Sequence, residues 1–295
     1  MTNFSYLIRP NRNAPNRQFY GYTSRRGAIQ IIVLHTAEAS PDYVDADTTA
    51  EAVSSYMSNN TRQVSWTATT DSDSAIFELP DSFLAQHVGG YNTIALGVEM
   101  ATIAALWPSM PDDHKTAILD TTAQVVALWC QRYGIPARRL TKAQVDAGQK
   151  GIVAHGDLSS QRTDPGAAFP WSDFLERVSY YLTGTLFAIG DSGEQVRGIQ
   201  QFMTAQGITG VGTADGDAGP LFDSAVRSWQ ATQAKARTGI FWVAPAPSTP
   251  EPTPEAPVLV AVPDATSTPA VPDLAQLPRT IELQPGESVL IRCAA

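Results

Sequence analysis

Residues 28–35 read Ala-Ile-Gln-Ile-Ile-Val-Leu-His, a short apolar run that is rich in β-branched side chains. A run of this length and composition predicts a buried β-strand. The stretches 94–101 (IALGVEMA) and 151–155 (GIVAH) have the same character, and residues 63–69 and 75–79, separated by a polar turn, predict a hairpin. We expect these segments to be the strands of a sheet.

Helical patterns lie between and after these strands. Thr48 and Glu51 form a capping box, which predicts a helix start at this point. Residues 112–134 begin with Asp112 as a candidate helix cap, carry apolar side chains at helical spacing and end on a glycine. We expect His114, in the first turn, to be solvated, and residues 171–182 predict a further helix. Strands interleaved with helices predict an α/β fold over residues 19–182, with a mixed β-sheet flanked by helices.

A second, smaller helical unit is expected over residues 187–240. Residues 194–205 and 220–229 each place apolar side chains on one helical face, and Pro220 stands at a helix start. Two short helices bury little by themselves, so we expect a third short helix, or a contact with the preceding domain, to complete the unit. The prediction is a small three-helix domain.

The end of the chain has a different composition. Ten of the 21 prolines fall within residues 244–278, which predicts an extended linker rich in Pro, Ala and Thr. Residues 279–295 predict a terminal β-hairpin around Gln-Pro-Gly-Glu. Because an isolated hairpin is marginal in water, we expect this tail to dock on a partner protein, a virion or a second copy of the chain.

Charge and cysteine content exclude several classes of protein. The 295 residues carry 20 basic and 29 acidic side chains, a net charge of −9, which argues against nucleic acid as the partner. Two cysteines cannot form a disulfide framework or a multi-cysteine zinc site. Residues 1–19 show no apolar signal region. The sequence contains no run of about 18 apolar residues, so we expect no membrane insertion. We therefore expect synthesis in a cytoplasm.

Two histidines end predicted strands, where side chains project from a sheet into a cleft. They are His35 and His155, and Asp164 follows the second after nine residues in a turn-forming loop. Two imidazoles and a carboxylate are a sufficient ligand set for catalytic zinc, which keeps a further position open for water. The alternative to a metal ligand, for each histidine taken alone, is that it is simply a hydrogen-bonded residue at the edge of the sheet.

Two further residues are candidates for chemistry. Glu99 lies within an apolar strand, where a carboxylate is costly unless it is paired or faces a polar cleft. It is a candidate general base for a zinc-activated water, or else an outward-facing strand residue. His87, in a glycine-rich loop before that strand, either donates a hydrogen bond to a substrate carbonyl or is an ordinary loop residue.

Five pieces of sequence match one known family in order. They are IIVLHTAE, the strand VSW, the loop FLAQHVGGYN, the strand ALGVEMA and the stretch IVAHGDLSSQRTDPGAAFPW. With these, residues 36–171 resemble the type-2 N-acetylmuramoyl-L-alanine amidases, a zinc amidase family that includes peptidoglycan recognition proteins and many phage lysins. The hairpin position that often carries Tyr or His near the metal reads Ser-Trp-Thr at 65–67 here.

The resemblance implies roles for individual residues. It makes His35, His155 and Asp164 the zinc ligands and places Glu99 at the catalytic carboxylate. Arg162 occupies the position at which the family usually has a lysine that stabilises the oxyanion. The positive charge is therefore retained, but as a planar guanidinium in place of an ammonium group.

A second resemblance concerns the small helical unit. The stretches IGDSGEQVRGIQQFMTAQGI and DGDAGPLFDSAVRSWQ are similar to the helical peptidoglycan-binding repeat often attached to cell-wall hydrolases. A weak binding module raises the effective concentration of a tethered enzyme at its polymer.

Together these resemblances imply a zinc-dependent peptidoglycan hydrolase that cuts the amide between N-acetylmuramic acid and L-alanine. A zinc peptidase acting within the stem peptide and a non-catalytic recognition module remain the alternatives. We expect a phage lysin that stays in the host cytoplasm before its release to the cell wall, or one that is carried on a virion.

Overall fold

The computed structural model describes residues 27–41, 49–59, 62 and 64–245. Thr48 of the predicted capping box, nearly all of the predicted linker 244–278 and the predicted hairpin 279–295 lie outside these residues. Among the described residues, no helix combines the length and the apolar composition needed to cross a bilayer.

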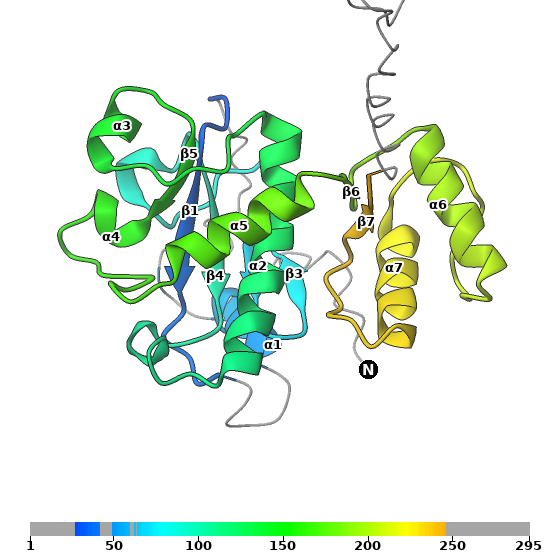
Figure 1. Cartoon of the computed structure of the whole chain (residues 1–295). Coiled ribbons are helices and arrows are strands. Elements are labelled where there is room, and N and C mark those ends of the chain that lie inside the picture. The colour runs from blue at the N-terminus through cyan, green and yellow to red at the C-terminus, as the bar shows by residue number, and fades with distance from the viewer. Residues whose placement is uncertain (1–26, 42–48, 60–61, 63, 246–295) are drawn as a thin grey trace, which may run out of the picture. The chain divides into compact units, whose positions relative to one another are not determined.

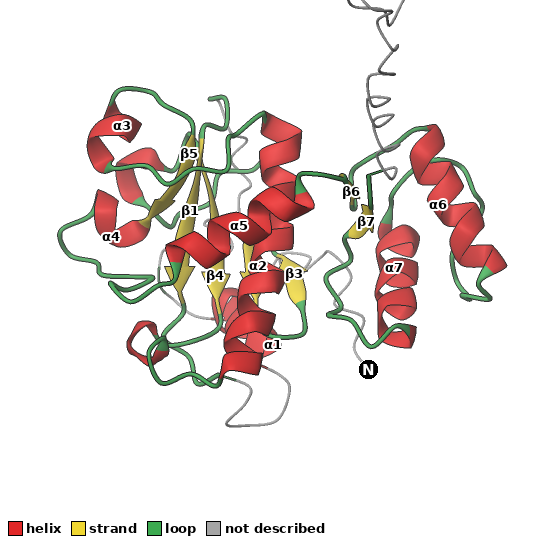
Figure 2. Ribbon diagram, viewed as in Figure 1, coloured by secondary structure: helices red, strands yellow, loops and turns green. Residues whose placement is uncertain are grey.

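A mixed β-sheet forms the centre of the described residues up to 182, here called the sheet domain (Figures 1 and 2). Its strands in the described residues follow the order β3-β2-β4-β1-β5. The central strand β1 (Ile31–Thr36) runs parallel to β4 (Ala95–Met100) and β5 (Gly151–Ala154). Strand β2 (Ala68–Thr70) is parallel to β4, whereas β3 (Ala75–Phe77) closes the edge as the antiparallel arm of the predicted hairpin.

Helices flank this sheet, which confirms the predicted fold class. The long helix α2 (Asp112–Tyr133) packs with α5 (Trp171–Tyr181) over one face (Figure 1). Helix α1 (Thr49–Asn59) contacts β2 and β3, and the short helices α3 (Lys142–Asp146) and α4 (His155–Leu158) adjoin β5 and β1. Single 3₁₀ turns, η2 (Gly89–Tyr91) and η3 (Ala104–Leu106), precede and follow β4.

Side-chain alternation along β1 decides which face carries the chemistry. Ile32 and Leu34 belong to the core beneath α2 and α5, whereas Ile31 and Val33 pack on the opposite face. Since successive strand residues point to opposite faces, His35 shares the face of Ile31 and Val33. The same alternation places Glu99 of β4 on that face, and the two strands pair His35 directly with Glu99. The sheet therefore presents both side chains side by side.

The C-terminal part of the described chain differs from the predicted three-helix domain. Helices α6 (Glu194–Ala205) and α7 (Pro220–Thr232) are present as expected. In place of a third helix, the described residues have a two-stranded antiparallel ribbon of β6 (Thr185–Phe187) and β7 (Phe241–Val243). Three-residue strands paired across more than fifty residues leave no local periodicity to detect.

Helix α2 makes direct contacts with this C-terminal part. The Gln131 amide donates to the Leu186 carbonyl at 2.8 Å and accepts from the Leu186 N–H at 2.9 Å. Arg132 forms an ion pair with Asp191 at 3.0 Å, and the Thr238 hydroxyl donates to Gln124. Leu186 is itself buried within the same apolar core as α2. The core thus continues past the sheet domain into the β6–β7 ribbon.

Replacing Leu186 with alanine is therefore expected to destabilise the sheet domain as well as the ribbon. Loss of a buried leucine side chain costs about 2–5 kcal/mol, and here the cavity opens beside α2. Leu221→Ala removes an equally large side chain that is 59% exposed and should change the free energy of unfolding by less than about 0.5 kcal/mol. The measurement is amide hydrogen exchange of α2, and unchanged protection in Leu186→Ala would mean that the ribbon folds independently.

Candidate active site

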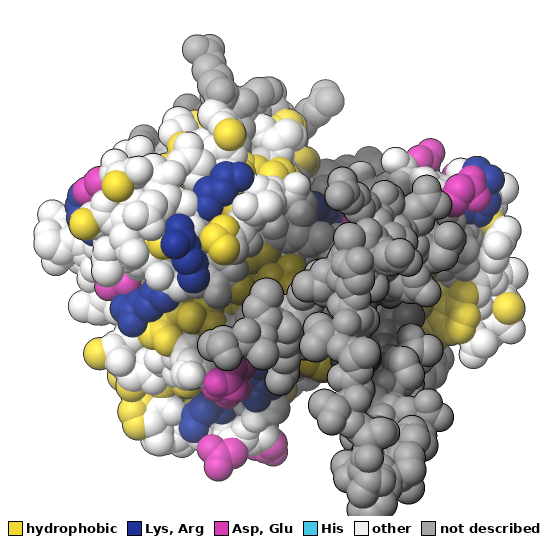
Figure 3. Space-filling view, turned by 45° about the horizontal axis from the view of Figure 1, so that its top comes forward, with side chains coloured by type: hydrophobic (Ala, Val, Ile, Leu, Met, Phe, Trp, Pro, Cys, Tyr) yellow, Lys and Arg dark blue, Asp and Glu magenta, His cyan; other side chains and the backbone are white. Residues whose placement is uncertain are grey.

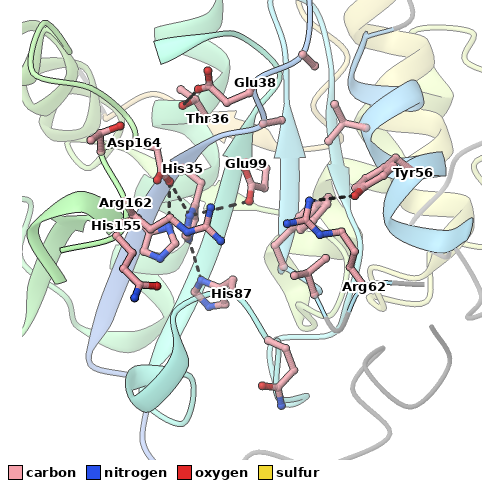
Figure 4. A pocket seen from close by; sticks show the side chains of 18 of the residues that line it. His35, Thr36, Glu38, Tyr56, Arg62, His87, Glu99, His155, Arg162 and Asp164 are labelled. Carbon is pink, nitrogen blue, oxygen red and sulfur yellow. Dashed lines mark hydrogen bonds and ion pairs between the residues drawn. The ribbon is translucent and has the colours of Figure 1, made fainter. Parts of the chain in front are cut away.

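Three side chains meet at the carboxyl ends of the parallel strands (Figure 4). His35 lies near the end of β1, His155 directly follows β5 as the first residue of α4, and Asp164 comes from the loop before α5. The Nδ1 atoms of His35 and His155 lie 3.0 Å and 3.1 Å from the same oxygen, Oδ2 of Asp164. Parallel strands bring their carboxyl ends to one edge, so residues far apart in sequence converge there.

These atoms suit a zinc ion. One ligand atom from each of the three residues lies within 4.8 Å of the others. Ligand atoms around a tetrahedral zinc, with bonds of about 2.0–2.2 Å, are roughly 3.3 Å apart. The observed separations of 3.0 Å and 3.1 Å are close to that value. The set also leaves a side open to a cavity, as a catalytic zinc requires.

Hydrogen bonds and burial set the ionisation of the cluster. Burial lowers the pKa of His35, although its hydrogen bond to Asp164 acts in the other direction. Burial alone would raise the pKa of Asp164, but hydrogen bonds from His155 and His35 outweigh it and hold that pKa well below its usual range. Asp164 is thus a carboxylate and His35 is readily neutral, which are the protonation states that a metal needs.

Glu99 lies beside His35, His155 and Asp164 but makes no part of the contact in which both histidines meet the Asp164 carboxylate. Its Oε1 atom is 3.9 Å from Nδ1 of His35, beyond hydrogen-bond distance. Burial raises the pKa of Glu99 to about 8, the charge of Asp164 adds to this rise, and Arg162 opposes it. A bound divalent cation would lower this pKa, because a nearby positive charge favours the carboxylate.

His87 contacts the cluster from the other side. Its Nδ1 atom lies 2.9 Å from Nε2 of His35, and the two rings meet edge to face. Gly97 leaves room for this ring, since a Cβ there would lie 2.5 Å from Nδ1 of His87. The Nε2 atom of His87 is buried. The geometry therefore favours orientation of His35 by His87 over direct donation to a substrate, the role considered from the sequence.

A cavity of about 640 Å³ opens over the cluster. Arg162 lines it next to the histidines, as the sequence suggested for an oxyanion-stabilising cation. The far wall comes from α1 and the segment after it, and includes Tyr56 and Arg62 (Figure 4). Trp66 also lines the cavity. Tyr56 and Arg62 could not be predicted as cavity residues from the sequence, because only the folded chain brings α1 opposite the strand ends.

A second buried glutamate lies outside the cavity. Glu78, just past β3, accepts hydrogen bonds from the hydroxyls of Thr69 at 2.6 Å and Ser54 at 3.1 Å. Thr69 in turn accepts from the indole N–H of Trp66 at 2.8 Å. Burial raises the pKa of Glu78 to about 8, with both hydroxyls opposing the rise. The network supports Trp66 in the cavity wall and offers a carboxyl group that resembles Glu99 in its pKa.

The raised pKa of Glu78 predicts a pH-dependent stability. The folded protein holds this proton up to about pH 8, whereas the unfolded chain releases it near pH 4.5. The free energy of unfolding should therefore fall as pH rises from 4.5 to 8, by up to about 1.4 kcal/mol per pH unit from this group.

Glu78→Gln should remove this contribution, because glutamine resembles the protonated acid and does not titrate. The measurement is urea unfolding of both proteins at several values between pH 5 and 8. Parallel pH profiles of the parent and the variant would contradict the assignment of the proton to Glu78.

One protein family is similar to the part of the chain that carries the candidate site. Residues 25–167, slightly less than half of the chain, match the sequence profile of the N-acetylmuramoyl-L-alanine amidase family. Over these residues the family resemblance predicted from the sequence is confirmed. All three candidate metal ligands, Glu99 and Arg162 fall inside the matched segment. No curated protein matches the chain.

Several solved structures are similar in fold. The Staphylococcus aureus hydrolase AmiA in complex with its ligand is 20% identical, with a TM-score of 0.41 over 54% of this chain and 78% of that chain. PlyL is 20% identical, with a TM-score of 0.40 over 55% and 90% of the two chains. A mutant endolysin from Bacillus subtilis is 18% identical, with a TM-score of 0.39 over 59% and 96%.

Proposed function

We propose that the protein is a zinc-dependent hydrolase that cuts the amide between the lactyl group of N-acetylmuramic acid and L-alanine in peptidoglycan. The observation that carries the proposal is the convergence of His35, His155 and Asp164 on one point beneath a cavity, with Glu99 beside them. The match of residues 25–167 to the amidase family supports the choice of bond.

The three ligands would hold zinc through two imidazole nitrogens and one carboxylate oxygen. When bound, zinc supplies a Lewis acid that polarises the substrate carbonyl and lowers the pKa of water toward about 7. In the protonation state that binds a metal, Nδ1 of His35 is free of its proton, so Nε2–H donates to Nδ1 of His87. His87 thereby fixes the ring orientation of His35.

Glu99 would act as the general base and then as the general acid. It accepts a proton as the water oxygen bonds to the lactyl carbonyl carbon, and the carbonyl oxygen takes up negative charge. Arg162, at the same cavity wall, would stabilise that oxyanion. Glu99 then returns the proton to the alanine nitrogen as the C–N bond breaks. The products are a lactyl carboxylate and a new L-alanine amino terminus.

Digestion of purified peptidoglycan by the zinc-loaded protein tests the proposal. Mass spectrometry should find free L-alanine amino termini and intact glycan strands. Cleavage between residues of the stem peptide would instead establish a zinc peptidase, and binding without cleavage would establish a recognition module. Metal analysis of the same sample should find one zinc per chain.

We also propose that residues 187–240 help to hold the enzyme on the wall. Residues 187–240 carry four basic and five acidic side chains, so they have no excess of positive charge. On the described surface visible in Figure 3, Lys and Arg side chains lie in separate groups with uncharged surface between them. Attachment would then depend on specific glycan and peptide contacts rather than on bulk charge. Sedimentation of an inactive Glu99→Gln protein with insoluble walls tests this, and a protein that stays in the supernatant would exclude it.

For the biological setting, we propose a phage lysin held in the host cytoplasm until its release to the wall, or carried on the virion. The predicted tail 279–295 would then dock on a virion protein or on a second copy. A pull-down from purified virions with the full chain is the test, with a chain ended at residue 245 as the control that should keep its hydrolytic activity.

A further inference from the structure

The Asp164 ligand lies on a loop without helix or strand, between α4 and α5. Its backbone is held locally by Gly156 N–H, which donates to the Asp164 carbonyl at 2.8 Å, and by Gly166 N–H, which donates to Thr163 at 2.8 Å. A loop carries no regular hydrogen-bond ladder to set its distance from β1. The separation of Asp164 from His35 must therefore depend on contacts between this loop and other parts of the fold.

Trp107, immediately after the turn η3, supplies such a contact. Its side chain is almost fully buried, and its indole N–H donates to the carbonyl of Pro165 at 2.8 Å, one residue after the ligand. The ring also packs edge to face on Phe169, with centroids 5.1 Å apart. Close by, a Cβ at Gly166 would lie 3.0 Å from the Ala104 carbonyl oxygen, so the two backbones are in tight contact.

The same turn is also tied to the end of β1. The backbone N–H of Ala104 donates to Oε1 of Glu38 at 3.0 Å, and the Thr36 hydroxyl donates to the same oxygen at 2.8 Å. Thr36 directly follows His35. The segment 104–107 therefore bridges the two chain segments that carry His35 and Asp164.

We propose that Trp107 is a positioning residue for the metal site: its indole N–H sets the Asp164 loop at the distance from His35 that zinc requires. This inference rests on the zinc hydrolase proposed above. The physical reason is that a metal tolerates ligand displacements of only about 0.2 Å. Groups outside the ligand set that orient ligands commonly change metal affinity by about 10–100-fold.

The test is the zinc dissociation constant, measured by competition with a chromophoric chelator, of the full-length Trp107→Phe protein. Phenylalanine keeps an aromatic ring in the core and removes the N–H, so zinc binding should weaken by about tenfold or more. Trp129→Phe is the matched control. Trp129 is also fully buried and packs edge to face on an aromatic ring, but its indole N–H has no hydrogen-bond partner among the described residues.

Both variants should lose thermal stability because each loses part of a buried ring, and Trp107→Phe should lose more because it also loses a buried hydrogen bond. Only Trp107→Phe should lose zinc affinity and shift the visible spectrum of the cobalt-substituted protein. Should Trp107→Phe fail to fold, benzothienylalanine at position 107 decides the question, because it keeps the bicyclic ring and lacks the N–H.

Parent-like zinc affinity in a folded position-107 variant would overturn the inference while leaving the zinc hydrolase intact. Equal weakening in Trp129→Phe would overturn it too, because the effect would then be one of general packing. If the parent protein itself binds no zinc, the proposed function fails and this inference fails with it.

Discussion

Replacing Glu99 with glutamine is expected to lower the rate of amide hydrolysis by roughly 10²–10⁴-fold, the range typical of a lost general base. Glutamine has nearly the same size and accepts no proton. Glu99 lies outside the contact shared by His35, His155 and Asp164, so the variant should keep its zinc. The measurement pairs the release of L-alanine amino termini with zinc stoichiometry on the same sample.

Glu78→Gln is a closely matched control for this prediction. Both glutamates are buried, and burial raises the pKa of each to about 8. Of these two glutamates, Glu99 lines the cavity above the histidines and Glu78 does not. Glu78→Gln should therefore change the pH dependence of stability and keep full activity. Full activity in Glu99→Gln would remove Glu99 from the proposed mechanism, whatever its effect on stability.

Local sequence patterns were sufficient to predict the sheet domain. The apolar, β-branched run around Ile31–Leu34 is β1, and the helical spacing after residue 112 is α2, which ends at Gly134 with a positive φ of 58°. Two local expectations at α2 were wrong. Asp112 looks like a helix cap, but the N-cap residue is Pro111 and makes no side-chain cap. His114 looks solvated and is buried, because tertiary packing decides which side of a first turn faces inward.

The candidate metal site was predictable for a topological reason. Parallel strands align their carboxyl ends at one edge of the sheet, so two histidines that each end such a strand are brought to the same edge. The contact of His87 with His35 was not predictable in the same way. It depends on a glycine-rich loop folding back over β4, where Gly97 leaves space for the ring.

The features that could not be predicted from the sequence are contacts between segments that are far apart in the chain. The bond from Trp107 to Pro165 spans 58 residues, and the contact of Gln131 with Leu186 spans 55. Nothing in the local composition around Trp107 marks it as different from Trp129, and both would be assigned to the core. The two tryptophans differ in a single hydrogen bond, from the Trp107 indole to Pro165, and only the folded structure reveals it.

Replacing Asp164 with alanine is expected to have the largest effect on the metal. Two imidazoles remain, and they lose the carboxylate that each contacts at 3.0–3.1 Å. Zinc affinity should fall by more than about 100-fold, the upper range for loss of a group that only orients a ligand, and activity should fall to background. Equilibrium dialysis against buffered free zinc, followed by metal analysis, is the measurement.

Asp157→Ala separates the loss of a ligand from the loss of a nearby negative charge. Asp157 lies in α4, two residues after His155, and pairs with Arg139 at 3.0 Å near the surface. Such a pair contributes at most about 1 kcal/mol, so this variant should keep both zinc and activity. Unchanged zinc stoichiometry in Asp164→Ala would exclude Asp164 from the ligand set. Loss of zinc in Asp164→Ala, together with loss of activity alone in Glu99→Gln, would separate metal binding from proton transfer within one cavity.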